Sequence, residues 1–132
     1  MNAYVFPGQG SQFSGMCQDL YIKNSSLKEF FDRAEAILGF NISKIMFEGT
    51  KEELTKTRVT QPAIFIHSMA IIKVLGNKFK PAMVAGHSLG EYTALACAET
   101  LSFSESLRLL RIRGKSMQEA VPNGEGGMVA IL

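Results

Sequence analysis

The chain has 132 residues, of which 46% are hydrophobic and 20% are charged, and its formal net charge at pH 7 is +2. This composition predicts one soluble globular domain, and it gives little support for binding to nucleic acid or to a membrane surface because Lys and Arg are scattered among Asp and Glu. Cys17 and Cys97 lie far apart in apolar or mixed surroundings, which favours two free, buried thiols and a reducing, cytoplasmic setting over a disulfide.

The first part of the chain predicts a strand and two helices. Ala3–Phe6 is a short apolar run closed by "PGQGSQ", which is typical of a buried strand that ends in an open loop. "SLKE" at 26–29 matches a capping box, and the apolar residues after it recur at helical spacing until Gly39, where we expect the helix to end. "TKEE" at 50–53 predicts a second capping box, at the start of a shorter helix.

A long helix, apolar on nearly every face, is predicted to begin at "TQP", residues 60–62, with Pro62 in the first turn, where its missing N–H does no harm. Its most hydrophobic segment, Pro62–Leu75, is interrupted by two polar residues and a lysine and is too short to span a bilayer. The N-terminus has no basic stretch followed by a long apolar run. We therefore expect neither a targeting signal nor a membrane segment.

The rest of the chain alternates strands and helices. Ala82–Ala85 predicts a second buried strand, which leads through a glycine-flanked serine into a helix at Tyr92–Glu99. "SFSE" at 102–105 predicts a third capping box and a helix that runs to about Ala120. Met128–Leu132 predicts one more strand.

This order of elements indicates an α/β layer fold with a parallel sheet. "NGEGG" at 123–127 is the best candidate for a linker, and a lone strand after it would have no partner of its own. We therefore interpret the chain as a piece of a longer protein.

The most specific local signal surrounds Ser88. Gly86–Gly90 satisfies the pattern G-x-S-x-G between a predicted strand and a predicted helix, where a sharp turn exposes the serine oxygen. The Leu89 amide, at the positive end of that helix, is placed to donate a hydrogen bond to an oxyanion. This placement favours a nucleophile over the alternative, a plain turn in which the serine caps the helix.

A serine nucleophile needs a base, and the chain offers only His67 and His87. Neighbouring side chains in an extended segment point to opposite sides, so we expect His87 to face away from the Ser88 hydroxyl and to order the turn instead. His67 lies in the apolar helix, where a hydrogen-bonded core histidine is the better interpretation. We therefore expect the base to lie outside these residues.

Four segments together resemble one known family. "VFPGQGSQ" at 5–12, "TQPA" at 60–63, "GHSLGEY" at 86–92 and "RGKSMQEAVP" at 113–122 closely resemble, in order and spacing, the bacterial malonyl-CoA:acyl carrier protein transacylases. The resemblance implies an α/β-hydrolase-like core, of which residues 1–124 would be the N-terminal part. Residues 125–132 would be the first strand of a smaller, ferredoxin-like subdomain, so that less than half of a family chain is present.

The resemblance also implies a reaction. Ser88 matches the nucleophile that takes a malonyl group from malonyl-CoA and passes it to the phosphopantetheine thiol of acyl carrier protein, with no further cofactor and no metal. Gln9 matches the residue whose backbone amide joins that of Leu89 in the oxyanion hole, and Arg113 matches the arginine that binds the free carboxylate of malonate. The family's catalytic histidine and a later glutamine belong to the part that is not present, and that part is itself an expected partner.

Helix geometry independently sets Arg113 apart. Arg108, Arg111 and Lys115 cluster on a solvated face of their predicted helix, whereas Arg113 falls on the opposite flank of its apolar stripe. A guanidinium there is costly unless a carboxylate pairs with it. The alternative is an arginine that reaches to water or pairs with a glutamate of the chain.

The sequence is compatible with three functions of different classes. The first is acyl transfer to a carrier protein, in fatty acid synthesis or as a discrete acyltransferase of a polyketide pathway. The second is a serine esterase or lipase that uses the same turn, although this would not explain "PGQGSQ" or the isolated arginine. The third is a non-catalytic fragment that binds acyl carrier protein or another chain.

Overall fold

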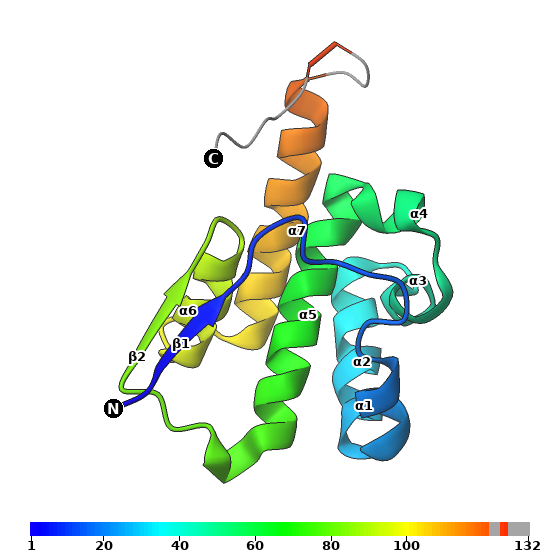
Figure 1. Cartoon of the computed structure of the whole chain (residues 1–132). Helices are drawn as coiled ribbons and strands as arrows, with labels where there is room; N and C mark the ends of the chain where they lie inside the picture. Colours follow the sequence, from blue (N-terminus) through cyan, green and yellow to red (C-terminus); the bar gives the residue numbers. More distant parts are fainter. Residues whose placement is uncertain (122–124, 127–132) are drawn as a thin grey trace.

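A computed structural model of the chain describes residues 1–121 and 125–126 (Figure 1). The elements are, in chain order, β1 (Ala3–Phe6), α1 (Gln18–Lys23), α2 (Ser26–Leu38), α3 (Ile42–Glu48), α4 (Lys51–Thr55), α5 (Thr57–Leu75), a 3-10 turn (Gly76–Lys78), β2 (Met83–Gly86), α6 (Gly90–Cys97) and α7 (Phe103–Ala120). The predicted α/β class is confirmed. The predicted linker and last strand, and the proposed boundary at residue 124, fall outside the described residues or at their edge.

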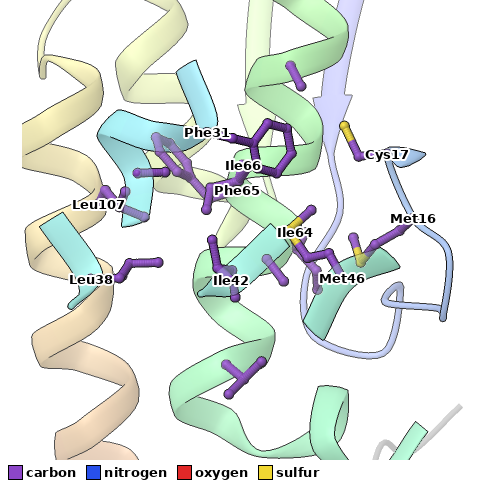
Figure 2. Packing of buried hydrophobic residues seen from close by; sticks show 14 of the residues in the cluster. Met16, Cys17, Phe31, Leu38, Ile42, Met46, Ile64, Phe65, Ile66 and Leu107 are labelled. Carbon is purple, nitrogen blue, oxygen red and sulfur yellow. The ribbon is translucent and has the colours of Figure 1, made fainter. Parts of the chain in front are cut away.

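Helix α5 runs through the middle of the molecule (Figure 1) and packs against α7, and α2 contacts both of these helices. Its residues from Val59 to Ile66 are all buried, as expected for a helix that is apolar on nearly every face. The Phe65 ring stacks on the Phe103 ring of α7, with centroids 5.5 Å apart. Figure 2 shows how side chains from α2, α3 and α7 meet α5 in one apolar cluster.

The same helix is long enough to cross a membrane. Together with the 3-10 turn it spans Thr57–Lys78, which is 22 residues. This is longer than Pro62–Leu75, the segment that the sequence analysis judged too short to span a bilayer. Its most apolar window is 56% buried by neighbouring helices. That burial is typical of the central helix of a globular core, because a membrane helix would present its apolar faces outward.

The two strands pair in parallel, with Ala3 opposite Met83 and Phe6 opposite Gly86. The prediction that both strands are buried is wrong. Val5 is 73% exposed and Met83 is 58% exposed, whereas Phe6 is 7% exposed. The reason is that α6 packs against one face of the sheet, and no element of the described part covers the opposite face.

Two of the three predicted capping boxes form. Thr50 with Glu53 begins α4, and Ser102 with Glu105 begins α7. The box predicted at 26–29 is wrong: the residue before α2 is Ser25, which already has helical dihedral angles and makes no side-chain cap. Gly39 ends α2 with φ of 78°, as predicted, because a left-handed residue at this position is easiest for glycine.

Helix starts and short helices account for the other differences. Helix α5 begins at Thr57, so Pro62 lies past its first turn and not within it. Helix α6 begins at Gly90, two residues before the predicted start. Helices α1 and α3 were not predicted from the sequence. Helix α3 is capped by the Asn41 side chain, which accepts a hydrogen bond from the Lys44 amide at 2.8 Å.

Both cysteines are free thiols, as predicted. Cys17 is buried, but Cys97 is only half-buried because α6 lies at the edge of the core. Burial raises the pKa of each thiol to about 11, so both are protonated and unreactive at neutral pH.

Candidate active site

Ser88 lies on a sharp turn between β2 and α6. The His87 amide donates to the Phe6 carbonyl at 3.0 Å, which ties the end of β2 to the end of β1. The next residue, Ser88, has φ of 54°, a left-handed conformation that non-glycine residues adopt rarely. The Gly90 amide then donates to the His87 carbonyl at 2.9 Å, and α6 begins. The strained residue is therefore the predicted nucleophile, and its side chain is exposed.

Two glycines make this turn possible. A Cβ atom on Gly86 would overlap the backbone of Gly90 and Glu91, so strand and helix can pass this closely only without it. A Cβ atom on Gly90 would lie 2.8 Å from the Pro7 carbonyl oxygen and would also overlap Phe6. Both glycines of the G-x-S-x-G pattern are thus required by close backbone approach.

The structure brings Arg113 to the same turn. Its Nη2 donates a hydrogen bond to Ser88 Oγ at 3.1 Å, across 25 residues of sequence and from a different helix, α7. The other terminal nitrogen, Nη1, is buried and has no hydrogen-bond partner among the described residues. No carboxylate of the described part pairs with Arg113, whereas Arg108, Arg111 and Lys115 are exposed on another face of α7, as predicted.

Of the two predicted oxyanion-hole residues, Leu89 lies in the turn itself and Gln9 lies in the loop after β1. Leu89 immediately precedes α6, and the amides that follow it, those of Gly90, Glu91 and Tyr92, donate to carbonyls of the turn. Gln9 lies in the loop after β1. This loop contacts the turn through Gly8, on which a Cβ atom would lie 2.5 Å from His87 Nδ1 and 3.0 Å from the His87 carbonyl oxygen.

Neither histidine is hydrogen-bonded to Ser88 in the part of the chain that the structure describes. His87 is exposed and its imidazole contacts Gly8. His67 packs its ring edge-to-face against Phe13, with centroids 5.8 Å apart, and its buried Nδ1 has no hydrogen-bond partner within the described ranges. Burial lowers the pKa of His67 below its ordinary value of 6.5. The expectation of a hydrogen-bonded core histidine is therefore wrong in one respect, since this half-buried ring has an unsatisfied nitrogen.

One buried polar residue of α5 contacts α7 and had no role in the sequence analysis. Gln61 of α5 is completely buried, and its Nε2 donates to Met117 Sδ at 3.1 Å. Met117 lies one helical turn after Arg113 on α7. The available signal was the amide side chain inside an otherwise apolar helix.

Hollows elsewhere on the surface are not part of this arrangement. One of about 820 Å³ lies where α4, α5 and α7 meet and is lined by Lys51, Lys56, Arg58 and neighbouring polar residues. Another, of about 260 Å³, lies between β1 and α5. Ser88 lines neither of them, and within the described ranges no three His, Cys, Asp or Glu side chains are grouped to hold a metal ion.

Known proteins share this sequence and this fold. The "Malonyl CoA-acyl carrier protein transacylase" of Escherichia coli (strain K12) is 49% identical over 133 residues, which is 98% of this chain and 43% of that protein. The protein of the same name from Bacillus subtilis (strain 168) is 48% identical, over 98% of this chain and 41% of its own length. The chain thus spans about two-fifths of these relatives.

Solved structures of proteins with the same kind of name have the same fold as this chain. An acyl carrier protein S-malonyltransferase from Vibrio cholerae superposes with a TM-score of 0.85 at 44% identity, over 92% of this chain and 40% of that chain. The malonyl-transacylase in the complex PlMCAT:AntF, with a type II PKS acyl-carrier protein, also has a TM-score of 0.85, at 47% identity and the same coverage.

A family model described as "Acyl transferase domain" matches residues 3–131. The match covers nearly the whole chain, including the turn at Ser88, Arg113 and the loop of Gln9. The resemblance carried by the four sequence segments is confirmed, and the chain belongs to the acyl transferase domain family.

Proposed function

We propose that Ser88 takes a malonyl group from malonyl-CoA and passes it to the phosphopantetheine thiol of acyl carrier protein. The observation that carries this proposal is the 3.1 Å contact between Ser88 Oγ and Arg113 Nη2 at an exposed, strained turn. It joins a nucleophile to a cation suited to a free carboxylate. The names of the Escherichia coli and Bacillus subtilis relatives support the same donor and acceptor.

The chemistry has two matched steps. Ser88 Oγ attacks the thioester carbonyl carbon, its proton passes to a base, the carbon–sulfur bond breaks, and coenzyme A leaves as the thiol after it takes up a proton. The thiol of the carrier protein then gives its proton to the base and attacks the malonyl-serine ester, the ester carbon–oxygen bond breaks, and the serine oxygen recovers its proton. In each step we assign the developing oxyanion to the amides of Leu89 and Gln9. Removing one such donor typically costs about 3 kcal/mol of transition-state stabilisation.

We assign the base to a residue outside this chain. Neither His67 nor His87 is hydrogen-bonded to Ser88 within the described part, and the relatives are more than twice as long. Ser88 without a base is expected to be acylated slowly, and rapid turnover is expected only when the rest of a family chain is supplied.

The proposed transfer needs no cofactor besides the substrate thioester and the pantetheine of the carrier protein. Arg113 supplies the charge that distinguishes a malonyl from an acetyl group. The two free thiols support a reducing setting, which we propose is the cytoplasm.

A polyketide pathway is a second candidate for the acceptor. The structural relative with 47% identity is a malonyl-transacylase in complex with a type II PKS acyl-carrier protein. The reaction on Ser88 is the same in both pathways, because both carriers present the same thiol. Only the surface of the carrier protein distinguishes them.

The test is the intact mass of the chain after incubation with malonyl-CoA, alone and with the remaining C-terminal part of the Escherichia coli relative added as a second chain. We expect one malonyl group on the wild type and none on Ser88→Ala, followed by loss of the group when acyl carrier protein with its pantetheine is added. Absence of an adduct in both mixtures contradicts the proposal. Hydrolysis of simple esters without transfer to the thiol would instead support an esterase.

A further inference from the structure

Two neighbouring hollows lie on the flank of α7 that faces away from Arg113. The larger, of about 820 Å³, lies where α4, the start of α5 and α7 meet, and the smaller, of about 280 Å³, lies between the end of α2 and α7. Arg58 and Gln118 line both hollows, so the two adjoin and can receive one ligand. Neither Ser88 nor Arg113 lines them, which separates them from the candidate active site.

The larger hollow carries positive charge that the described part of the chain does not neutralise. Its lining includes one carboxylate, that of Glu52, and three cations. The cations are Lys51, Lys56 and Arg58. Within the described ranges no ion pair joins any of these four exposed side chains. The start of α5, which has no acidic residue in its first turn, adds to the positive potential. Cations that line one concave surface favour a multiply charged anion.

The smaller hollow has apolar walls as well as cationic ones. Leu38 and the half-buried Phe40, at the end of α2, supply the apolar lining. Arg111 lines the same hollow, and its Nη1 donates to the Ile37 carbonyl at 2.9 Å, which holds the guanidinium in place. Aromatic rings and guanidinium groups both stack on flat π-systems. This hollow therefore suits a planar, aromatic group.

We propose that the two hollows together bind a nucleoside diphosphate, with the base in the smaller hollow and the phosphates in the larger. Arg58 lies at the junction, and its guanidinium has neither an acceptor nor a carboxylate partner among the residues described. It is suited to bind a phosphate through two parallel N–H···O bonds, while Lys51 and Lys56 supply further charge. A concave site with one compartment for a flat ring and one for charge fits a small ligand better than a protein surface.

Two sources share this chemistry, a free nucleotide and the nucleotide end of coenzyme A. We assign the site to the free nucleotide, because the hollows lie on the other flank of α7 from Arg113. The inference does not rest on the proposed function, since nucleotide binding there uses neither Ser88 nor Arg113.

The test is isothermal titration calorimetry of the chain with ADP, and with adenosine and inorganic pyrophosphate as probes of the two halves. We expect ADP to bind one-to-one and at least tenfold more tightly than either probe, because only ADP fills both hollows. Arg58→Ala should weaken ADP binding about tenfold, the size of one hydrogen bond to a charged group. Arg108→Ala is the matched control and should leave the affinity unchanged, since this exposed arginine of α7 lines neither hollow.

Two further variants separate the base from the phosphates. Phe40→Leu keeps an apolar side chain but removes the ring, so we expect it to weaken ADP binding several-fold and to leave pyrophosphate binding unchanged. Lys56→Ala should weaken the binding of ADP and of pyrophosphate by the same factor. In NMR spectra, ADP should shift the amide signals of Arg58 and Gln118 and leave that of Leu89 in place.

Absence of saturable ADP binding, equal affinity for ADP and pyrophosphate, or an Arg58→Ala variant that binds as well as the wild type would overturn the proposal. Malonylation of Ser88 distinguishes the two sources. We expect Arg58→Ala to leave unchanged the malonyl-CoA concentration that gives half the maximal rate. A rise in that concentration would assign the hollows to coenzyme A and overturn a separate site. A chain that binds ADP but takes no malonyl group would overturn only the proposed function.

Discussion

Arg113 differs from Arg33 and Arg111 in what its guanidinium contacts. Arg33 donates to Ser104 Oγ from two nitrogens, and Arg111 donates to the Ile37 carbonyl at the end of α2 at 2.9 Å. Both are therefore bound to groups of the fold itself. Among the described residues, Arg113 donates a side-chain hydrogen bond only to Ser88, and its buried Nη1 has no partner there. A guanidinium that binds an anion fits this arrangement better than an arginine that reaches to water.

Replacing this side chain should therefore affect substrate choice more than folding. We expect Arg113→Ala to slow malonylation of Ser88 on the order of 10-fold to 100-fold, because a charge-assisted pair with the carboxylate is lost. Acetylation should change much less, since an acetyl group has no carboxylate to pair. Rates from intact mass with the two thioesters provide the check, and equal losses for both would refute the role of Arg113.

At the scale of single elements, the sequence was most informative where structure is local. The capping boxes at Thr50 and Ser102 formed as predicted because all their atoms lie within four consecutive residues. The same pattern at Ser26 did not, because backbone hydrogen bonds from Leu27 to Asn24 and from Lys28 to Ser25 already close a tight turn there. A capping-box pattern in the sequence therefore shows only that the cap can form, and the conformation of the preceding turn determines whether it does.

Features that depend on distant residues could not be predicted in the same way. The exposure of Val5 follows from which elements cover the sheet, a property of the assembled fold. The turn at Ser88 was predicted because its geometry is encoded by adjacent glycines. Its contact with Arg113 joins residues on different elements, so spacing along the chain could only suggest it. The burial of Gln61 beside Met117 had no local signal except its polarity.

Ser102 and Ser26 allow a direct comparison between a predicted helix cap that forms and one that does not. Ser102 accepts from the Glu105 amide at 3.2 Å, so Ser102→Ala is expected to lower the free energy of unfolding by about 1 kcal/mol. Ser26 makes no cap, so Ser26→Ala should change it by less than about 0.5 kcal/mol. Urea unfolding followed by circular dichroism measures both, and equal effects would contradict the assignment of caps.

Acid provides an independent control on the Ser102 cap. Hydrogen bonds from the Ser102 side chain and backbone lower the pKa of Glu105 below its ordinary value of 4.5. A carboxylate whose pKa is lowered by folding stabilises the fold above the unfolded pKa, and that contribution is lost as the pH falls through the folded value. The difference in the free energy of unfolding between the wild type and Ser102→Ala should therefore be constant near neutral pH and become smaller below about pH 4.5. If this difference in stability became larger in acid, the hydrogen bonds between Ser102 and Glu105 would not be the source of the stabilisation.

At the scale of the whole molecule, stability and chemistry lie in different places. The apolar core lies among the helices around α5, whereas Ser88 follows β2, in the sheet of two strands that the described part of the chain forms. Such a small sheet is marginal by itself, and here one of its faces is open. The chain also spans only about two-fifths of its relatives. The turn at Ser88 therefore lies between this thinly covered sheet and the buried Leu89, which directly precedes α6.

Hydrogen exchange should reveal this division. We expect the amides of α5 around Phe65 and Ile66, which are completely buried, to exchange only through global unfolding. The amides of β1 and β2, for instance near the paired residues Val5 and Ala85, should exchange through a local opening of lower free energy. Adding the C-terminal part of the Escherichia coli relative should slow exchange in the strands and speed acylation of Ser88, with α5 unchanged. Equal protection of strands and core in the isolated chain would mean that the turn at Ser88 is already held rigidly, and that the proposed reaction is limited only by the supply of a base.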